Sequence, residues 1–391
     1  MKKIRNKLFI NNDELFLLSN PKKSRKKSRN KNKKKCIDFS LICVISLFII
    51  FTILILFIII KLINRALKPK SNENTKTEFN NLMEHYNSNT TILLIGMGKL
   101  ENNYIREWVE YHKGIGINKI ILCDNNAIDG ENLSEPIKDY IDSNFVEMDE
   151  SFRGKSLLQV ECYVKHFNNN HMKYDWITIN DIDEFIFIEK GSGYINIQQF
   201  LDQPIFNDTD NIILTWKYYD DNNILDVVNG DYSVLKRFTR NNSFGNNITD
   251  SNCLSKAIYK GKVEREYEVG NHCIQGFKDS RGRKYVFRKA DGNIMKFETI
   301  GYCFYNFNKT HFPVSIHHFQ LKSIGEYIKN KMLKRESSKP YKYNFKFFFD
   351  INELTEEKVK YAQKILSNDK LKSEQYNIAY YVEKLELKKN K

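Results

Sequence analysis

The sequence predicts an α/β protein in which a mixed sheet with parallel βαβ units follows a single N-terminal membrane helix. Three observations support this prediction. An apolar segment near the N-terminus carries no charge, short apolar strands alternate with amphipathic helices after it, and two aspartates interrupt the apolar run at residues 176–188. Strands that alternate with helices are typical of parallel sheets covered by helices.

The membrane helix is predicted by residues 41–60, which are twenty positions without a charged side chain. At roughly 1.5 Å per residue they cover the roughly 30 Å hydrocarbon core of a bilayer. No small-residue cleavage pattern follows them, which argues against a cleaved signal peptide. A buried core helix is the less favoured alternative. We therefore predict a transmembrane helix over residues 39–61, within a lipid bilayer.

The distribution of charge orients this helix. Residues 1–35 hold fourteen Lys or Arg against Asp13 and Glu14, a net charge of +12, whereas residues 61–70 hold four basic side chains. By the positive-inside rule the tail, residues 1–38, is cytoplasmic and the rest is lumenal or extracellular. The predicted topology is single-pass type II. The basic tail suits anionic lipid head groups or sorting machinery, with a merely solvated retention tail as the alternative.

The part of the chain beyond the membrane is almost neutral. The whole chain carries +14, but residues 71–391 carry a net charge of −1. Because nucleic-acid-binding domains show a basic excess, we predict no nucleic-acid partner. We divide this part into a polar stem (62–90), an α/β domain (91–335) and a C-terminal helical extension (336–391).

Five cysteines follow the membrane helix, so at most two disulfides can form beyond it. We expect one of them between Cys253 and Cys273. No Cys-x-x-Cys pair and no zinc-like spacing occurs in the sequence, which argues against a structural zinc site.

The α/β domain begins with a regular alternation of elements. Strands are predicted at 91–97, 119–123, 145–148 and 176–188, and helices at 103–114, 133–141 and 157–167. Polar residues follow three of the strands: Glu101 and Asn102, Asp124 and Asn125, Asp181 and Asp183. Ligands bind outside the carboxyl ends of parallel strands, so these clusters predict one site for a nucleotide and its metal.

The later part of the chain carries weaker signals. A strand is predicted at 212–219, and residues 323–326 have the form of a capping box that starts a helix. The aromatic run at 341–349 is expected to pack in a core or sheet, with a ligand-binding platform as the alternative. Helices without chemistry are expected over 353–387.

Asp181 and Asp183 predict a metal site. Alternate side chains of a strand point the same way, so both carboxylates can face one ion while their neighbours pack. A carboxylate pair within an apolar strand needs a ligand or a partner. Oxygen ligands suit Mg²⁺ or Mn²⁺, whose other positions are filled by water and substrate phosphates. Two solvated acids at a strand end are the alternative.

Further motifs occur in order along residues 91–335. They are Lys99-x-Glu101-x-x-Tyr104, Glu107-Trp108-x-x-Tyr111-His112, Asp124-Asn125, Asp129-Gly130, Asp175-Trp176, Asp181-Ile-Asp183-Glu184-Phe185, Trp216, Lys236-Arg237-Phe238-Thr239, Lys256-Ala257-Ile258, His272, and Ile316-His317-His318-Phe319 with Lys322-Ser323. This series resembles glycosyltransferase family 92 and related family 2-like enzymes of GT-A fold.

The resemblance implies a GT-A fold and inverting transfer of a hexose, with galactose as one option. The donor would be a nucleotide sugar such as a UDP-sugar, and the acceptor a hydroxyl of a glycan or glycoprotein. The membrane-anchored layout is also the usual one for such transferases in the Golgi, with the ER as the alternative compartment.

The resemblance also suggests roles for particular residues. Mn²⁺ (or Mg²⁺) would be held by Asp183 and by Asp181, directly or through water, with His318 or the competing His272 as a further ligand. Asp124 would bind the nucleoside, and Lys99 or Arg153 would reach phosphate. The full set of expected donor-binding residues is Lys99, Glu101, Asn102, Asp124, Asn125, Arg153 and Asp181.

An inverting transfer needs a general base near the acceptor hydroxyl. Asp220 or Asp221, after the strand at 212–219, and Glu184, beside the metal pair, are the expected bases, with surface acids as the alternative. Two features depart from the family pattern: Asn and Ala follow Asp124 where acidic or hydroxyl residues are usual, and His317 replaces an Asn. Both concern donor contacts rather than the class of enzyme.

Two other functions remain open from the sequence. An inactive, membrane-tethered sugar-binding protein would keep the fold without turnover, which the intact aspartate pair argues against. A metal-dependent nucleotidyl or phosphoryl transferase would use the same carboxylates, but the sequence holds no phosphate-binding loop of the GxxxxGK[ST] type.

Overall fold

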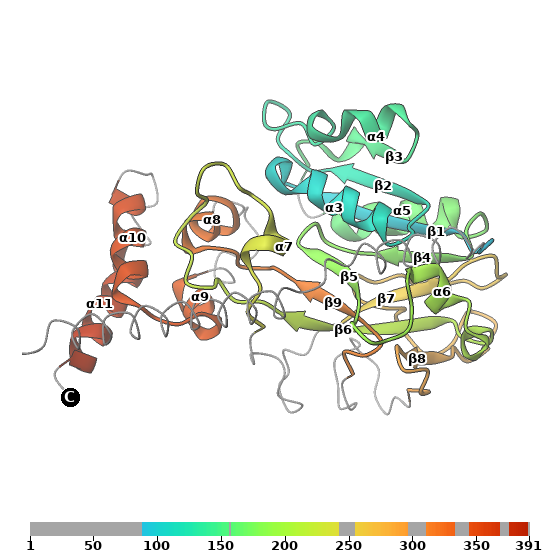
Figure 1. The fold of residues 1–391 in the computed structure, drawn as a ribbon. Helices are drawn as coiled ribbons and strands as arrows, with labels where there is room; N and C mark the ends of the chain where they lie inside the picture. Colours follow the sequence, from blue (N-terminus) through green and yellow to red (C-terminus); the bar gives the residue numbers. More distant parts are fainter. Residues whose placement is uncertain are drawn as a thin grey trace, which may run out of the picture. The chain divides into compact units, whose positions relative to one another are not determined.

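The computed structural model of the protein describes residues 88–155, 158–241, 255–295, 310–332, 344–367 and 375–389 (Figure 1). The predicted tail, the predicted membrane helix and most of the stem lie outside these residues. In the described part of the chain, no helix is both long and apolar enough to cross a bilayer. Residues 79–391 form one compact unit.

Four parallel strands make one half of the sheet, in the order β3-β2-β1-β4. These strands are β1 (Ile92–Gly98), β2 (Lys119–Asp124), β3 (Val146–Asp149) and β4 (Trp176–Ile179). The connecting helices are α3 (Asn102–Gly114), α4 (Lys138–Asp142) and α5 (Gln159–Asn170). The predicted βαβ units are therefore confirmed. The helix predicted at 133–141 is shorter, because a 3₁₀ turn with Pro136 (Glu135–Ile137) precedes α4.

The other half of the sheet is mostly antiparallel and curls. It continues from β4 in the order β7-β6-β9-β5, and β8 pairs with β6. These strands are β5 (Glu184–Ile188), β6 (Asn211–Tyr218), β7 (Ser255–Lys260), β8 (Phe287–Lys289) and β9 (Val314–His318). Strand β6 pairs with β8 through residues 211–213 and with β9 through residues 216–218. Short helices α6 (Ile197–Leu201) and α7 (Val234–Arg237) lie in the connections.

The single strand predicted at 176–188 is wrong. Residues 176–179 pair with β1 and β7, whereas residues 184–188 pair with β9. Between them the chain turns, and the Glu184 N–H donates to the Asp181 carbonyl at 3.0 Å. Asp181 and Asp183 thus lie in a turn between two strands that pair with different partners. Strand alternation does not set their directions.

Both faces of the parallel half are covered by helices. Ile92 and Leu94 face a buried cluster with Trp108 of α3, and Leu93 faces a second cluster with Tyr163 of α5. All five side chains are at most 1 % exposed. This two-sided burial explains why the strands read as continuous apolar runs rather than as alternating patterns.

The C-terminal helices pack around the segment that follows β9. They are α8 (Ile324–Glu326), the π-helical turn η4 (Tyr327–Met332), α9 (Phe345–Ile351), α10 (Glu356–Ser367) and α11 (Gln375–Lys389). The predicted capping box is confirmed, since Ser323 and Glu326 cap each other's backbone N–H groups. Phe345 and Phe348 of the aromatic run pack against Tyr327 in a buried cluster.

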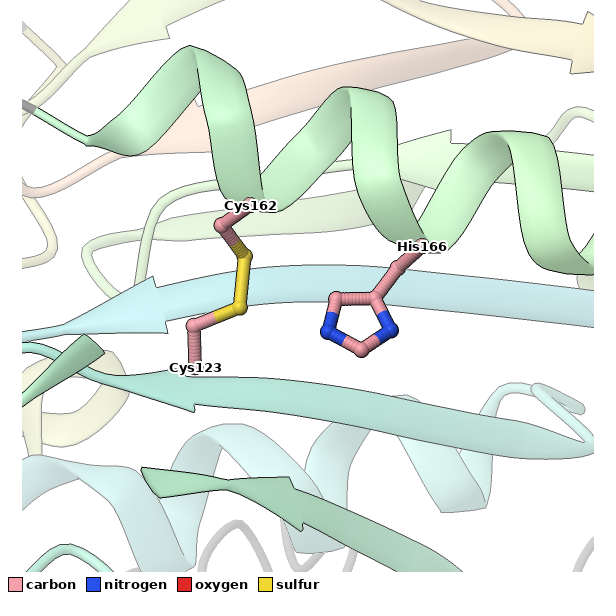
Figure 2. Close-up of side chains that lie close together, drawn as sticks. All are labelled: Cys123, Cys162 and His166. Carbon is pink, nitrogen blue, oxygen red and sulfur yellow. A yellow bond between two sulfur atoms is a disulfide. The ribbon is translucent and has the colours of Figure 1, made fainter. Parts of the chain in front are cut away.

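Cys123 of β2 and Cys162 of α5 form a disulfide, with Cα atoms 6.5 Å apart (Figure 2). We did not predict this pair from the sequence. Cys273 is also disulfide-bonded, but its expected partner Cys253 lies outside the described residues. The Cys123 to Cys162 bridge joins β2 to the helix that covers it, just before Asp124.

Candidate active site

The carboxyl ends of the parallel strands bring the predicted polar clusters to one edge of the sheet. Gly98 pairs in register with Asp124, and the Asn125 N–H donates to the Gly98 carbonyl at 2.9 Å. After β4, the Asn180 N–H donates to the Ile95 carbonyl at 3.1 Å. The residues that follow β1, β2 and β4 therefore lie at the same edge, as the alternation of elements predicts.

Asp181 is held by three side chains. One carboxylate oxygen accepts from the Gln159 amide at 2.7 Å and the Tyr163 hydroxyl at 3.0 Å, both from α5. The other lies 3.3 Å from the Lys256 ammonium. Burial is the largest influence and raises the pKa of Asp181, but the positive charge of Lys256 and the other favourable contacts together lower the pKa below its usual value. The side chain is 33 % exposed, so this ionised carboxylate is accessible to a ligand.

Asp183 is more deeply buried, with a side chain 5 % exposed. One oxygen pairs with the ammonium of Lys331 from η4, and the other lies 3.3 Å from Nε2 of His318. Burial raises the pKa of Asp183, but Lys331 and then His318 lower it well below its usual value. This carboxylate is ionised in the absence of any metal.

Glu184 lies behind the aspartate pair and is fully buried. Its Oε2 lies 3.2 Å from the Lys256 ammonium and accepts from the Asp181 N–H at 3.0 Å. Its Oε1 has no hydrogen-bond partner among the described residues. Burial raises the pKa of Glu184 well above its usual value. Glu184 therefore braces Asp181 and Lys256 from the interior.

Two histidines, one from β9 and one from the loop after β7, both lie against Trp216. The ring centre of Trp216 lies 4.2 Å from that of His318 and 5.6 Å from that of His272. Nδ1 of His272 donates to the Ser255 carbonyl at 2.9 Å. Burial, and then Lys256, lower the pKa of His272 to about 4. Burial also lowers the pKa of His318, so both rings are neutral at pH 7, the form that binds metals.

The donor set at this edge fits a divalent cation such as Mn²⁺. It combines two ionised carboxylates with imidazole nitrogens, and Nδ1 of the buried His318 ring has no hydrogen-bond partner within the described part of the chain. The ammonium of Lys331 already gives Asp183 a positive partner. A bound metal cation would give this carboxylate a positive partner of the same kind. The fit is therefore chemical: the structure shows carboxylates that require cations and an imidazole with an unused nitrogen.

Another group of ligand-type residues is closer together. The atoms of Cys123, Cys162 and His166 lie within 4.8 Å of one another, and no other such group of three occurs in the described residues. The two sulfurs are bonded to each other, so they are not available as thiolates. His166 instead pairs with Asp149 at 2.7 Å. This cluster is a disulfide beside a hydrogen bond between His166 and Asp149.

Asp124 and Arg153 lie together because they form an ion pair with each other. Asp124 is fully buried, accepts from the Asn126 N–H at 2.8 Å and the Leu133 N–H at 3.1 Å, and pairs with Arg153. Arg153 also donates to the Glu131 carbonyl at 2.9 Å. The pair thus closes the loop after β2, in which expected donor contacts lie.

The remaining expected donor residues surround this loop. Asn125 donates to the Phe152 carbonyl at 3.1 Å and the Lys155 carbonyl at 2.8 Å. Asn102 donates to the Asn132 carbonyl at 2.9 Å. Glu101 is 5 % exposed, with the Lys322 ammonium 3.7 Å from its carboxylate, and Lys99 is half-buried after β1.

Asp220 and Asp221 follow β6, and the structure ties both to other side chains. Asp220 pairs with Arg240 at 2.6 Å. Asp221 pairs with Lys358 of α10 at 2.7 Å, and neither of these two side chains is exposed. Burial raises the pKa of Asp221, while the hydrogen bond from Lys358 opposes this effect. No contact of either aspartate with Asp181 or Asp183 occurs among the described residues.

Sequence reasoning missed the two lysines that neutralise the aspartate pair. Lys256 lies within β7 and is 1 % exposed. The sequence did contain a signal for it, because a charged side chain in an apolar strand needs a partner, as Asp181 and Asp183 do. Lys331 lies in η4, far along the chain, and no local pattern links it to Asp183. Gln159 and Tyr163 were also missed. They are polar positions on a helix whose other features predict only that it packs on the sheet.

Comparison with known proteins agrees with this architecture. No curated protein matches the chain. The sequence model of glycosyltransferase family 92 matches residues 94–340, which span the sheet, both aspartates of the pair and the C-terminal side of the site through η4. The match covers more than half of the chain. The chain belongs to glycosyltransferase family 92.

Proposed function

We propose that the protein is an inverting, metal-dependent glycosyltransferase that transfers a hexose from a UDP-sugar to a hydroxyl of a glycan or glycoprotein. Galactose is the first hexose to test. Family membership supports transfer of a sugar. The single observation that carries the rest is the position of Asp181 and Asp183, two ionised carboxylates beside His318 at the carboxyl edge of a parallel sheet.

The proposed fold is of GT-A type. The order β3-β2-β1-β4 with helices on both faces supports a nucleotide-binding half, and the antiparallel strands β7, β6, β9 and β5 complete the sheet. The aspartate turn lies where one half passes into the other, after β4 and before β5. Such a junction at the ends of parallel strands is a general place for a nucleotide.

In the proposed site Asp181, Asp183 and His318 would hold Mn²⁺ or Mg²⁺, and His272 is the alternative nitrogen ligand. When bound, the cation would supply positive charge to the departing diphosphate. The chain prepares this site without it: Lys256 keeps Asp181 ionised, Glu184 braces both, and Tyr163 and Gln159 orient the carboxylate.

Donor binding is proposed for the loops around Asp124. Lys99, Glu101, Asn102, Asn125 and Arg153 lie at or near this edge and would contact the nucleotide. The general base stays a prediction among Glu184, Asp220 and Asp221. Asp221 and Glu184 are both fully buried and paired with a lysine, which favours a structural role for each. Asp220 keeps a side chain 10 % exposed, so it is the first of the three to test as the base.

We further propose a type II topology with the domain in the lumen of the Golgi, or of the ER. The apolar segment and the basic tail support this location. The Cys123 to Cys162 disulfide is consistent with it, because disulfides persist in oxidising compartments and are rare in the cytosol.

The test uses the purified full-length protein with a panel of nucleotide sugars and Mn²⁺, and it measures release of nucleoside diphosphate. We expect release from one donor, loss of release after EDTA treatment, and loss in Asp183→Ala. Asp142→Ala, which removes an exposed aspartate of α4, is the matched control and should behave as wild type. Release of pyrophosphate or nucleoside monophosphate would instead indicate a nucleotidyl or phosphoryl transferase. If the folded protein releases no nucleoside diphosphate from any donor of the panel, the result would favour an inactive sugar-binding protein.

A further inference from the structure

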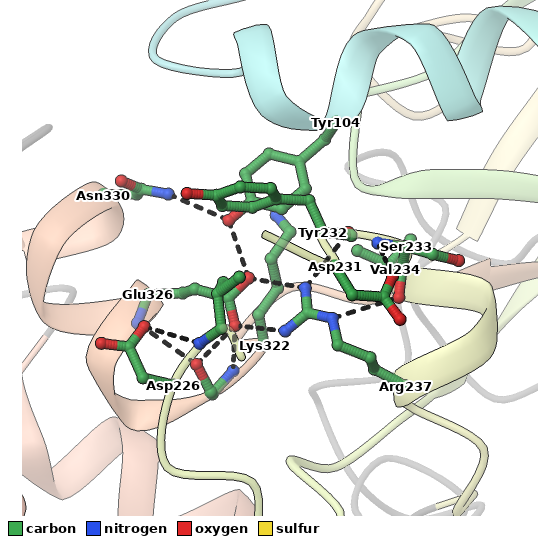
Figure 3. Close-up of polar contacts among 12 residues, drawn as sticks. Tyr104, Asp226, Asp231, Tyr232, Ser233, Val234, Arg237, Lys322, Glu326 and Asn330 are labelled. Carbon is green, nitrogen blue, oxygen red and sulfur yellow. Dashed lines mark hydrogen bonds and ion pairs between the residues drawn. The ribbon is translucent and has the colours of Figure 1, made fainter. Parts of the chain in front are cut away.

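A polar cavity lies next to the proposed reaction site, and none of the roles above uses it. Its volume is about 230 Å³. Three separate segments line it: the start of α3, the loop between β6 and α7, and the helical turns α8 and η4 (Figure 3). Because residues far apart in the sequence form this cavity, its walls are set by the tertiary fold.

One wall is a neutralised carboxylate. Both oxygens of Glu326 accept from the Arg237 guanidinium, at 2.7 and 2.8 Å, and the Tyr104 hydroxyl donates to Glu326 at 2.7 Å (Figure 3). Glu326 is 3 % exposed. A two-pronged Arg to carboxylate contact fixes direction as well as charge. Burial and the neighbouring Glu326 raise the pKa of Tyr104, so its hydroxyl keeps its proton.

Asp226 also lines the cavity, and it is paired as well. Its carboxylate accepts from the Tyr361 hydroxyl at 2.7 Å and from the Lys329 ammonium. A Cβ atom at Gly325 would lie 2.5 Å from Cγ of Asp226, so the backbone of α8 approaches this side chain as closely as a glycine permits. Asp226 is therefore held in one position beside the cavity.

Tyr232 adds an aromatic ring to these polar groups. It is half-buried, and its ring meets that of Tyr104 edge-on, with centres 5.8 Å apart. Asn330 contributes an amide whose nitrogen lies 3.4 Å from the Tyr104 hydroxyl, a long contact. An amide carries two donors and an acceptor, so Asn330 has capacity left for a ligand.

The cavity and the proposed metal site share one helical segment. Lys329 and Asn330 of η4 line the cavity, and the next residue, Lys331, pairs with Asp183. On the other side, Asn103 and Tyr104 line it directly after the expected donor residues Glu101 and Asn102. The cavity is thus lined by residues that directly neighbour, in sequence, a partner of Asp183 and two expected donor residues.

We infer that this cavity binds one neutral sugar unit of the acceptor glycan, an inference that rests on the proposed function. Pockets that enclose drug-sized ligands measure about 300–1,000 Å³, so this smaller cavity suits a single ring rather than an oligosaccharide. Carboxylates and cations are already paired in its walls, which disfavours a charged ligand. Amide, hydroxyl and carboxylate groups beside an aromatic ring match a ring with hydroxyls on its edge and C–H groups on its face.

The first experiment measures binding without turnover. Saturation-transfer NMR of the full-length protein is recorded with methyl glycosides of the common neutral hexoses, deoxyhexoses and N-acetylhexosamines. We expect one or a few to bind to wild type. Tyr232→Ala should weaken that binding about tenfold, whereas Tyr232→Phe, which keeps the ring, should stay within about twofold. Tyr380→Ala, at a tyrosine 58 % exposed on α11, is the control for loss of a surface ring.

The second experiment measures kinetics with the donor that the protein cleaves. Tyr232→Ala and Asn330→Leu are expected to raise the acceptor KM about tenfold while cleavage of the donor by water persists. That split separates loss of acceptor binding from loss of fold or of donor binding. An unchanged acceptor KM in both variants would overturn the inference and leave the proposed function intact.

The two proposals fail in different ways. If no donor is cleaved but a glycoside binds in a Tyr232-dependent manner, the cavity is a sugar site and transferase activity is refuted. If a donor is cleaved but no glycoside binds, or Tyr232→Ala binds as wild type does, the cavity does not hold the acceptor sugar. A charged sugar that binds in preference to all neutral ones would also overturn the inference.

Discussion

Two pairs of aspartates follow buried strands in this domain, and they have opposite surroundings. Asp181 and Asp183 follow β4 and lie beside His318 and a half-open edge, with the Asp181 side chain 33 % exposed. Asp220 and Asp221 follow β6 and are paired with Arg240 and with the fully buried Lys358. In sequence the two pairs look alike, as acids after an apolar strand. The difference teaches that partners from other segments, not the local pattern, decide whether such a pair stays accessible or is sealed.

The cations that neutralise each pair show the same contrast. Lys256 and Lys331 reach the first pair from β7 and η4, next to neutral imidazoles, and leave Asp181 open to a ligand. Lys358 reaches Asp221 from α10 with no exposure on either side. A buried ion pair without access can hold two segments together, whereas an ionised carboxylate with access can also bind metal.

The largest effect is expected when one aspartate of each pair is replaced by asparagine. Asp183→Asn should lower kcat/KM for transfer by about 10³ or more, because the site loses one of its two carboxylates. Asp221→Asn should retain far more activity per folded molecule. Steady-state rates normalised to folded protein by circular dichroism check both. An equal loss in Asp221→Asn, with unfolding unchanged, would make Asp221 a catalytic residue and break the comparison.

The second prediction concerns stability. Lys358→Met should lower the free energy of unfolding by about 3–5 kcal/mol, because it leaves Asp221 buried without its partner. The double variant Lys358→Met with Asp221→Leu should recover most of that loss, since it removes both charges. Urea unfolding at pH 7 measures the three proteins. A Lys358→Met protein as stable as wild type would mean that water reaches Asp221.

A third prediction separates two adjacent histidines of β9. His318 and His317 point to opposite faces, and the nitrogens of His317 contact Glu189 at 3.0 Å and Tyr219 at 2.9 Å. His318→Gln should weaken Mn²⁺ binding about tenfold to hundredfold, while His317→Gln should leave it unchanged. Mn²⁺ titration followed by electron paramagnetic resonance reports affinity without turnover. Equal weakening in both would point to a general loss of folding.

The smallest effect is a pH dependence from a buried histidine that has no acidic partner among its hydrogen bonds. His112 donates to the Trp108 carbonyl at 2.8 Å and accepts from the Ile186 N–H at 3.3 Å. Burial lowers the pKa of His112 to about 3. Between pH 6.5 and 3 only the unfolded state takes up the proton, so the free energy of unfolding decreases as the pH is lowered.

This uptake should cost about 1 kcal/mol between pH 6.5 and 5.5. His112→Gln should be less stable at pH 7 but lose less on acidification over the same range. Urea unfolding at both pH values checks the difference. Parallel losses in the two proteins would show that His112 is protonated in the folded state.

Much of the parallel half of the fold could be predicted from the sequence. Apolar runs such as 91–97 and 119–123 become β1 and β2, because a strand buried on both faces must be apolar throughout. The helix with Trp108 and the capping box at Ser323 were also visible, since helical spacing and caps are local. The split of 176–188 into β4 and β5 was not, because an apolar run does not record which strands it pairs with.

The site was predictable only in part, for the same reason. A charge within an apolar run is recognisable from the sequence alone, so Asp181 and Asp183 could be named. Their cations Lys256 and Lys331 come from distant segments that only the sheet order and η4 bring close. The Cys123 to Cys162 disulfide and the cavity around Tyr104 also depend on contacts between segments far apart in the chain.

The sequence by itself determined the alternation of strands and helices, the aspartates that need a partner, and the order of motifs that places the chain in its family. Each of these depends on periodicity or on the cost of burying a charge, which are properties of short segments. The tertiary structure alone decided which acids are sealed by Lys358 and which remain open beside His318. That choice depends on the pairing of strands and the docking of helices, where residues a hundred positions apart share one low-dielectric environment.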